Sequence, residues 1–146
     1  MPATPPFTPP IGMLLGATGR QADRAFDDAL AGAGGSRSVW LVLLAVRVRA
    51  AENQRQIAQQ AGIQGPTLTH HLNAMERDGL LVRRRDPQNR RVHIVELTPA
   101  GEQLFERLRD TAVDFDRRLR KNLSDDDTAR LRELLTRIGE NVRAAV

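Results

Sequence analysis

The 146-residue chain contains no cysteine, no tyrosine and a single tryptophan, and Lys121 is the one lysine among its 22 basic residues. Without cysteine the chain can form no disulfide framework, no thiolate metal site and no thiol redox switch. No segment approaches the roughly 18 uninterrupted apolar residues of a membrane span. The start MPATPPFTPP has neither the basic head nor the apolar core of a signal peptide. We therefore expect a soluble cytoplasmic protein with no membrane partner.

Positive charge is concentrated in one place. The net charge of +4 is modest, but residues 83–91 contain five arginines against one aspartate. The near absence of lysine has a simple explanation in genome composition, although arginine also suits planar, bidentate contacts with phosphate and guanine. This segment predicts a local basic surface.

The spacing of apolar residues predicts four helices, a β-hairpin and two further helices, after a proline-rich, extended arm over residues 1–10. Ser36 or Ser38 caps a second helix that is apolar nearly all round and therefore buried. Asn53 caps the third helix, and Gly62 ends it in a left-handed turn. The hairpin spans residues 80–97, and Val92, Ile94 and Leu97 alternate imperfectly with polar residues in its second strand.

The third and fourth helices form a helix-turn-helix between Arg55 and Gly79, and the basic hairpin follows immediately. Leu68, Leu72 and Met75 share one face of the fourth helix, which predicts that this face is buried. The outer face carries small, hydrogen-bonding residues: Pro66, His70, Asn73 and Arg77, with Thr67 and Thr69 on the flanks. An ordinary surface helix would show a similar pattern, but the basic hairpin beside it favours insertion into a DNA groove.

The run IAQQAGIQGPTLTHHLNAMERDGLLVRRRDPQNRRVHIVELTPAG, residues 57–101, resembles the recognition helix and wing of the MarR family of bacterial regulators. The flanking helices are similar too, so the resemblance covers nearly the whole chain. It implies a mainly α fold with a small β-hairpin wing, in the winged helix-turn-helix (α+β) class. It also implies a homodimer that binds a pseudo-palindromic operator in double-stranded DNA, with repression as the family's habit.

The resemblance further implies a single domain over residues 11–146. Dimerisation and core helices occupy residues 11–50, the DNA-binding lobe residues 51–98, and C-terminal dimerisation helices residues 99–146. In the family, one helix enters the major groove and a wing arginine enters the minor groove, and these supply most of the expected DNA contacts. We add Asn73 and Arg55 to them. The expected DNA-binding residues are Gln64, Gly65, Pro66, Thr67, Thr69, His70, Asn73, Arg55, Arg90 and Arg91.

One departure from the family pattern concerns the wing. Many members have an aspartate two residues before the wing arginine, where this chain has Asn89. An amide can still orient Arg91, but as an uncharged acceptor it generally bonds more weakly than a carboxylate, so we expect a looser wing or a contribution from Asp86. Which arginine reaches deepest is left open.

Members of the family commonly respond to small aromatic or phenolic molecules held between the dimerisation helices and the DNA-binding lobe. By resemblance, Phe26, Arg37, Trp40 and His71 are candidates for such an effector pocket, with ordinary core packing as the alternative. His70 and His71 are adjacent and point about 100° apart on a helix, so we expect neither a metal site nor another cofactor.

No nucleophile and base stand at a recognised catalytic spacing, so we expect no enzyme. Two alternatives to an effector-controlled DNA-binding repressor remain. A metal-responsive winged-helix regulator is disfavoured by the missing cysteines and scattered histidines. A winged-helix protein-interaction module would show exposed apolar or acidic residues on the fourth helix, whereas this helix carries Thr, His, Asn and Arg.

Overall fold

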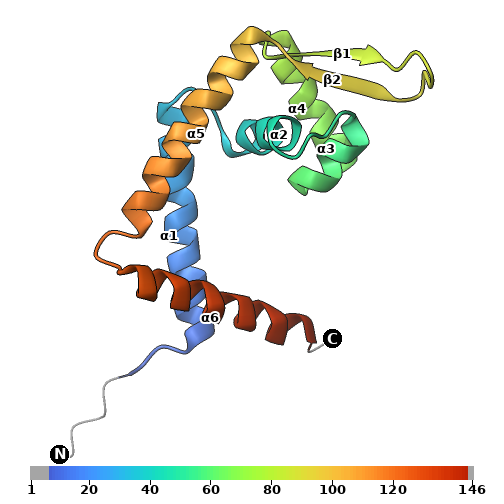
Figure 1. Ribbon diagram of the computed structural model, residues 1–146. Helices are drawn as coiled ribbons and strands as arrows, with labels where there is room; N and C mark the ends of the chain where they lie inside the picture. The colour runs from blue at the N-terminus through green and yellow to red at the C-terminus, as the bar shows by residue number, and fades with distance from the viewer. Residues whose placement is uncertain (1–6, 145–146) are drawn as a thin grey trace, which may run out of the picture. The chain divides into compact units, whose positions relative to one another are not determined.

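The computed structural model describes residues 7–144, and these contain the predicted order of helices and hairpin. The elements, shown in Figure 1, are α1 (Ile11–Gly32), α2 (Arg37–Arg47), α3 (Gln54–Ala61), α4 (Gly65–Arg77), β1 (Leu81–Arg85), β2 (His93–Leu97), α5 (Pro99–Leu119) and α6 (Asp125–Ala144). The chain divides into two units, with the boundary between Ala112 and Val113. Most of the predicted arm over residues 1–10 lies outside the described residues, and residues 7–10 have no regular structure.

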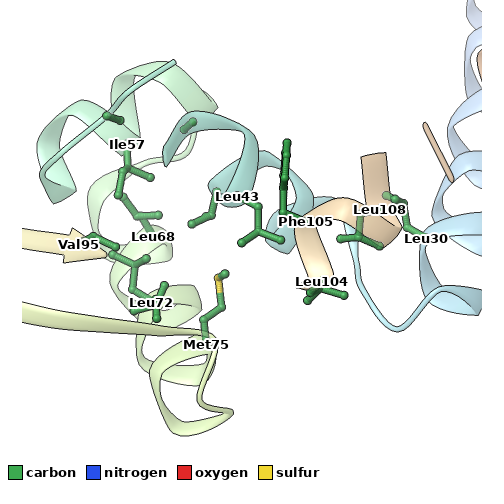
Figure 2. Close-up of a cluster of buried hydrophobic side chains, with 14 residues drawn as sticks. Leu30, Leu43, Ile57, Leu68, Leu72, Met75, Val95, Leu104, Phe105 and Leu108 are labelled. Atoms are coloured by element: carbon green, nitrogen blue, oxygen red, sulfur yellow. The ribbon is translucent and has the colours of Figure 1, made fainter. Parts of the chain in front are cut away.

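The first unit is built around one apolar core. Leu68, Leu72 and Met75 of α4 are buried, as predicted, and they belong to the same cluster as Leu43 of α2 (Figure 2). α5 contributes further buried side chains to this cluster. The buried set is Leu30, Val42, Leu43, Ala45, Ala51, Ile57, Leu68, Leu72, Met75, Leu81, Val95, Leu104, Phe105 and Leu108. Burial of each leucine contributes roughly 1.5–3 kcal/mol, so this core holds the helices and the hairpin of the first unit together.

Local side-chain caps explain where the helices begin. Ser36 Oγ accepts a hydrogen bond from the Val39 N–H at 3.2 Å, so Ser36, and not Ser38, caps α2. Asn53 Oδ1 accepts from the Gln56 N–H at 2.9 Å and caps α3. Both caps satisfy an N–H that has no partner within its helix.

The hairpin differs in one respect from the expected pattern. Val95, which the expected alternation of Val92, Ile94 and Leu97 did not include, is the buried residue of β2 at 3% exposure, and Val92 and Ile94 are only half-buried. β1 and β2 are antiparallel with Leu81 opposite Leu97. On its other side, β2 receives a second contact, because the Val95 N–H donates to Glu52 O at 3.0 Å. The non-local pairing therefore sets which face of β2 meets the core, because side chains alternate along a strand.

The second unit contains the end of α5 and all of α6. Ser124 and Asp127 cap α6 reciprocally, since each backbone N–H donates to the other residue's side-chain oxygen at 3.0 Å. No residue of α6 among those described is buried, and all of its large apolar side chains except the half-buried Ile138 are exposed. These exposed residues are Leu131, Leu134, Leu135 and Val142.

Within residues 7–144, no single helix is long and apolar enough to cross a membrane. α1 and α2 meet the criteria of length and composition only when they are taken as a pair, and the pair is bent by 78°.

Candidate nucleic-acid interface

α3 and α4 form the helix-turn-helix. Gly62 adopts a left-handed conformation with φ of 67°, which ends α3 and allows α4 to start three residues later. Because α4 buries Leu68, Leu72 and Met75, its opposite side faces outward. Every residue predicted to bind DNA is exposed, and on α4 and its N-cap these are Gln64, Gly65, Pro66, Thr67, Thr69, His70 and Asn73.

The first turn of α4 is open to an anion. Gln64 occupies the N-cap position, but its side chain makes no capping hydrogen bond. Pro66 lies in the first turn, where its missing N–H leaves no unsatisfied donor. The remaining N–H groups of this turn and the positive end of the helix dipole are arranged to receive a phosphate.

Three of the five arginines in residues 83–91 direct their guanidinium groups to protein partners. Arg83 pairs with Glu76 of α4 at 2.5 Å, and Arg84 pairs with Glu96 across the hairpin at 2.9 Å. Arg85 donates to the backbone oxygen of Arg90 at 2.8 Å. Arg83 is the most enclosed of the three, with 18% of its side chain exposed. These arginines stabilise the wing and its attachment to α4.

Arg90 and Arg91 differ from these three arginines in having no protein partner for their guanidinium groups among the described residues. Both are exposed, and within residues 7–144 neither guanidinium has a hydrogen-bond or ion-pair partner. An arginine without a protein partner keeps its full charge and all five donors for a ligand. The wing tip therefore presents two such groups side by side in the sequence.

Hydrogen bonds between side chains and the backbone shape the wing tip. Asn89 Oδ1 accepts from the backbone N–H of Arg91 at 3.2 Å, and Asp86 Oδ1 accepts from the backbone N–H of Gln88 at 2.9 Å. The sequence predicted an uncharged hydrogen bond from Asn89 to Arg91 or a contribution from Asp86, and the bond that Asn89 makes is to the Arg91 backbone and not to its guanidinium. Both Asn89 and Asp86 bond to the backbone of the turn, because Asn and Asp bond readily to a backbone N–H two residues on.

A concavity of about 580 Å³ lies between α3, α4 and the wing. It brings together three of the predicted DNA-binding residues, Arg55, Thr69 and Arg91. Every ionisable side chain in its lining is basic, since Arg83 and His93 join the two predicted arginines and no carboxylate is present. Like charges gathered in one hollow attract a polyanion.

The four residues predicted to form an effector pocket have different surroundings. Arg37 lines a concavity of about 310 Å³ beside Ser36 and Ser38, but Phe26, Trp40 and His71 do not line it. The Arg37 guanidinium pairs with Asp27 at 2.8 Å and with Asp23 at 3.2 Å. The hydrogen bond to Asp27 is the main cause that raises the pKa of Arg37, so its charge persists.

The other three effector candidates have packing contacts. Trp40 stacks on Phe105 of α5, with 5.9 Å between ring centroids and 12° between ring planes. Phe26 packs against the core, and His71 is half-buried with its ring 6.0 Å from that of His70. Core packing, the alternative reading of Trp40, accounts for its position.

Sequence reasoning missed two residues that connect the parts of the interface. Gln54 of α3 donates from Nε2 to Thr69 Oγ1 at 2.6 Å, and Arg83 of β1 donates from Nη2 to Asn73 Oδ1 at 2.5 Å. Gln54 is one of several polar residues in its helix, and Arg83 is one of five arginines in its segment, so neither carries a distinguishing sequence signal.

A helix-turn-helix followed immediately by a basic β-hairpin, with long helices before and after it, defines a winged helix-turn-helix protein. The MarR family profile matches residues 36–93, from the N-cap of α2 to the first residue of β2. The chain is 28% identical over 90 residues to the uncharacterized HTH-type transcriptional regulator YdgJ of Bacillus subtilis (strain 168). That match includes 62% of this chain and spans only 55% of the length of YdgJ.

Two solved structures are similar over nearly the whole chain. The transcriptional regulator PA3341 matches with a TM-score of 0.74 and 30% identity, over 92% of this chain and 99% of its own. The transcriptional repressor CouR, in a structure with a 23-mer DNA duplex, matches with a TM-score of 0.75 and 29% identity, over 89% and 92%. The chain belongs to the MarR family, whose members are transcription regulators and not enzymes.

Proposed function

We propose that the protein is a transcriptional regulator that binds a specific sequence in double-stranded DNA. In this proposal α4 enters the major groove, and Arg90 and Arg91 at the wing tip reach the adjacent minor groove. The observation that carries it is the division among the wing arginines. Arg83, Arg84 and Arg85 are used within the protein, whereas Arg90 and Arg91 keep their guanidinium groups for a ligand.

Two features of α4 support DNA as the ligand. Its exposed face offers hydrogen-bonding side chains that can reach base edges, and its uncapped N-terminus suits a phosphate. The concavity beside it, lined by Arg55, Arg83 and Arg91, would lie along the polyanionic backbone. A module for protein interaction would expose apolar or acidic residues on this face. The relative CouR was solved bound to a DNA duplex.

The test is binding to the region upstream of the protein's own gene and to a randomised DNA pool, at several salt concentrations. Arg91→Ala and Arg90→Ala are expected to weaken specific binding about tenfold or more and to make it less salt-dependent, because each phosphate contact contributes about 0.9 to the slope of log K against log salt. Arg84→Ala is the matched control. This substitution removes the same charge from the same hairpin, but the guanidinium that it removes is already paired with Glu96. It should therefore change binding about twofold or less.

Two outcomes would contradict the proposal. Equal losses in Arg84→Ala and Arg91→Ala would mean that only total charge matters. Failure of the wild-type protein to select any sequence from the randomised pool would leave the protein-interaction module as the leading function.

We further propose that the active form is a homodimer that binds a pseudo-palindromic operator. Apolar side chains are exposed on α1 and, separately, on α6, and such patches usually mark an interface. They are Ile11, Met13, Leu14 and Leu15 on α1, and Leu131, Leu134, Leu135 and Val142 on α6. Leu134→Glu should dissociate the dimer in analytical ultracentrifugation and weaken operator binding. Thr136→Glu, at an exposed polar position of the same helix, should do neither, and a monomeric wild type would refute the idea.

Repression, and its relief by a small aromatic or phenolic effector, complete the proposal. Repression is supported by the relative CouR, described as a transcriptional repressor. An in vitro transcription assay in which the protein stimulates the promoter would contradict it. The effector can be tested directly, because Trp40 is the single tryptophan of the chain and its fluorescence reports binding nearby. An effector should change this fluorescence and release DNA over the same concentration range.

A further inference from the structure

The side chain of Asn73 is held by the wing. Arg83 Nη2 lies 2.5 Å from Asn73 Oδ1, and Arg83 Nε lies 2.5 Å from Glu76 Oε2. A guanidinium carries donors only, so the Asn73 atom that it contacts must be the carbonyl oxygen. The bond is charge-assisted, and Arg83 itself is largely enclosed, with 18% of its side chain exposed. The orientation of the Asn73 amide is therefore set by β1, a different element from its own.

This arrangement determines which chemical group Asn73 offers. Its oxygen is engaged, whereas its Nδ2 hydrogens have no partner within residues 7–144. The neighbouring Thr69, one helical turn earlier, has no free donor hydrogen. Its hydroxyl has one hydrogen, which it donates to Gly65 O at 3.0 Å, and its oxygen accepts from Gln54 Nε2 at 2.6 Å. Thr69 thus has no hydrogen left for DNA, and Asn73 has two.

We propose that Arg83 is a positioning residue that turns Asn73 into a donor, so that Nδ2 donates to an acceptor atom of the DNA. The acceptor is a purine N7 or a phosphodiester oxygen. The inference rests on the proposed DNA-binding function. It disfavours the two-bond contact by which an asparagine reads adenine, because an amide oxygen already bound and oriented by Arg83 would have to accept from the adenine amino group through its second lone pair.

Glu76 strengthens this role of Arg83. A guanidinium tied to one acceptor can swing about that bond, but one tied to Glu76 through Nε and to Asn73 through Nη2 has its plane fixed. The same bridge joins β1 to α4, so the wing and the helix that is proposed to enter the major groove are held in one geometry.

The experiment crosses protein variants with modified operators. The operator selected from the randomised pool is synthesised with one change at a time: 7-deazapurine, which lacks the N7 acceptor; purine in place of adenine, which lacks the amino donor; or a methylphosphonate, which lacks a charged phosphate oxygen. Dissociation constants are measured for wild type, Asn73→Ala, Arg83→Met and the control Arg84→Met. Arg84 pairs with Glu96, and within residues 7–144 it forms no hydrogen bond or ion pair with α4.

At one position in each half-site, loss of the acceptor should weaken wild-type binding about three- to tenfold, the effect of one hydrogen bond. A 7-deazapurine effect assigns the acceptor to a base, and a methylphosphonate effect assigns it to the backbone. Asn73→Ala and Arg83→Met should both be insensitive at that position, and Arg84→Met should behave as wild type. Removal of the adenine amino group should affect wild type and Asn73→Ala equally.

Three results would overturn the inference. The first is an adenine amino group that matters to wild type but not to Asn73→Ala. The second is full sensitivity to the missing acceptor in Arg83→Met, and the third is the absence of any position that separates wild type from Asn73→Ala. If Arg83→Met does not fold, Arg83→Lys replaces it, because one ammonium cannot reproduce the fork between Glu76 and Asn73 and should lose the same sensitivity. Failure of the proposed function itself is distinct, since the wild-type protein would then select no operator.

Discussion

Gly101, the third residue of α5, lies where the turn after α4 meets the start of that helix. A Cβ atom added to Gly101 would lie 2.0 Å from the backbone oxygen of Leu80 and 3.0 Å from its carbonyl carbon. The obstacle is backbone, so it cannot be relieved by a change of rotamer. We predict that Gly101→Ala forces this junction apart and destabilises the first unit.

The magnitude follows from the contacts at the junction. Leu80 O accepts from the Thr98 N–H at 3.0 Å, and Thr98 Oγ1 accepts from the Gly101 N–H at 3.1 Å as the cap of α5. Loss of the cap costs about 1 kcal/mol and loss of the backbone bond about 1 kcal/mol. Overpacking adds about 1–3 kcal/mol. The expected total is about 3–5 kcal/mol, which lowers Tm by about 10 °C in a chain of this length.

Thermal unfolding followed by circular dichroism at 222 nm measures this change. Gly32→Ala is the control, because Gly32 lies in the last turn of α1 and a Cβ there meets no atom within 4 Å. It should leave Tm unchanged or raise it, since alanine is favoured over glycine in a helix by up to about 1 kcal/mol. A Gly101→Ala protein with the Tm of the wild type would refute the reasoning.

Three smaller effects can be measured by urea unfolding. Asn53→Ala removes the cap that accepts from the Gln56 N–H and should cost about 1 kcal/mol; an unchanged midpoint would show that α3 does not depend on this cap. Ala50 has a positive φ of 52°, so Ala50→Gly should stabilise the protein, by about 1 kcal/mol at most, and a loss of stability would contradict the strain argument. Ser124→Ala breaks one half of the reciprocal cap with Asp127 and should lower the stability of α6 by about 1 kcal/mol, while Ser124→Thr should preserve it; equal effects of the two would exclude the cap as the cause.

The starts of α2, α3, α5 and α6 were predictable because each depends on contacts within a few residues. A cap at Asn53 or Thr98 reaches an N–H three residues later in the chain. Gly62 needs its left-handed conformation for the turn alone. The local pattern did not choose between Ser36 and Ser38, because either hydroxyl could precede the same apolar run.

The interior of the hairpin was predicted less well, since it depends on contacts between distant segments. Apolar residues occur on both faces of β2, so alternation alone does not decide which face is buried. The bond from the Val95 N–H to Glu52 O, which joins β2 to the segment before α3, decides it. The stacking of Trp40 on Phe105 was not predictable for a similar reason, because the two residues lie far apart in the sequence.

The sequence by itself determined the helix-turn-helix and the outward face of α4, because periodicity and capping are local properties, and its resemblance to a known family indicated the rest. Only the tertiary structure decided which arginines are available to a ligand. The five arginines of residues 83–91 are chemically identical, and their partners lie on other elements or across the hairpin, as Glu76 and Glu96 do. A guanidinium is free or engaged according to what folding places beside it, so Arg83 became part of the scaffold while Arg91 stayed exposed at the wing tip.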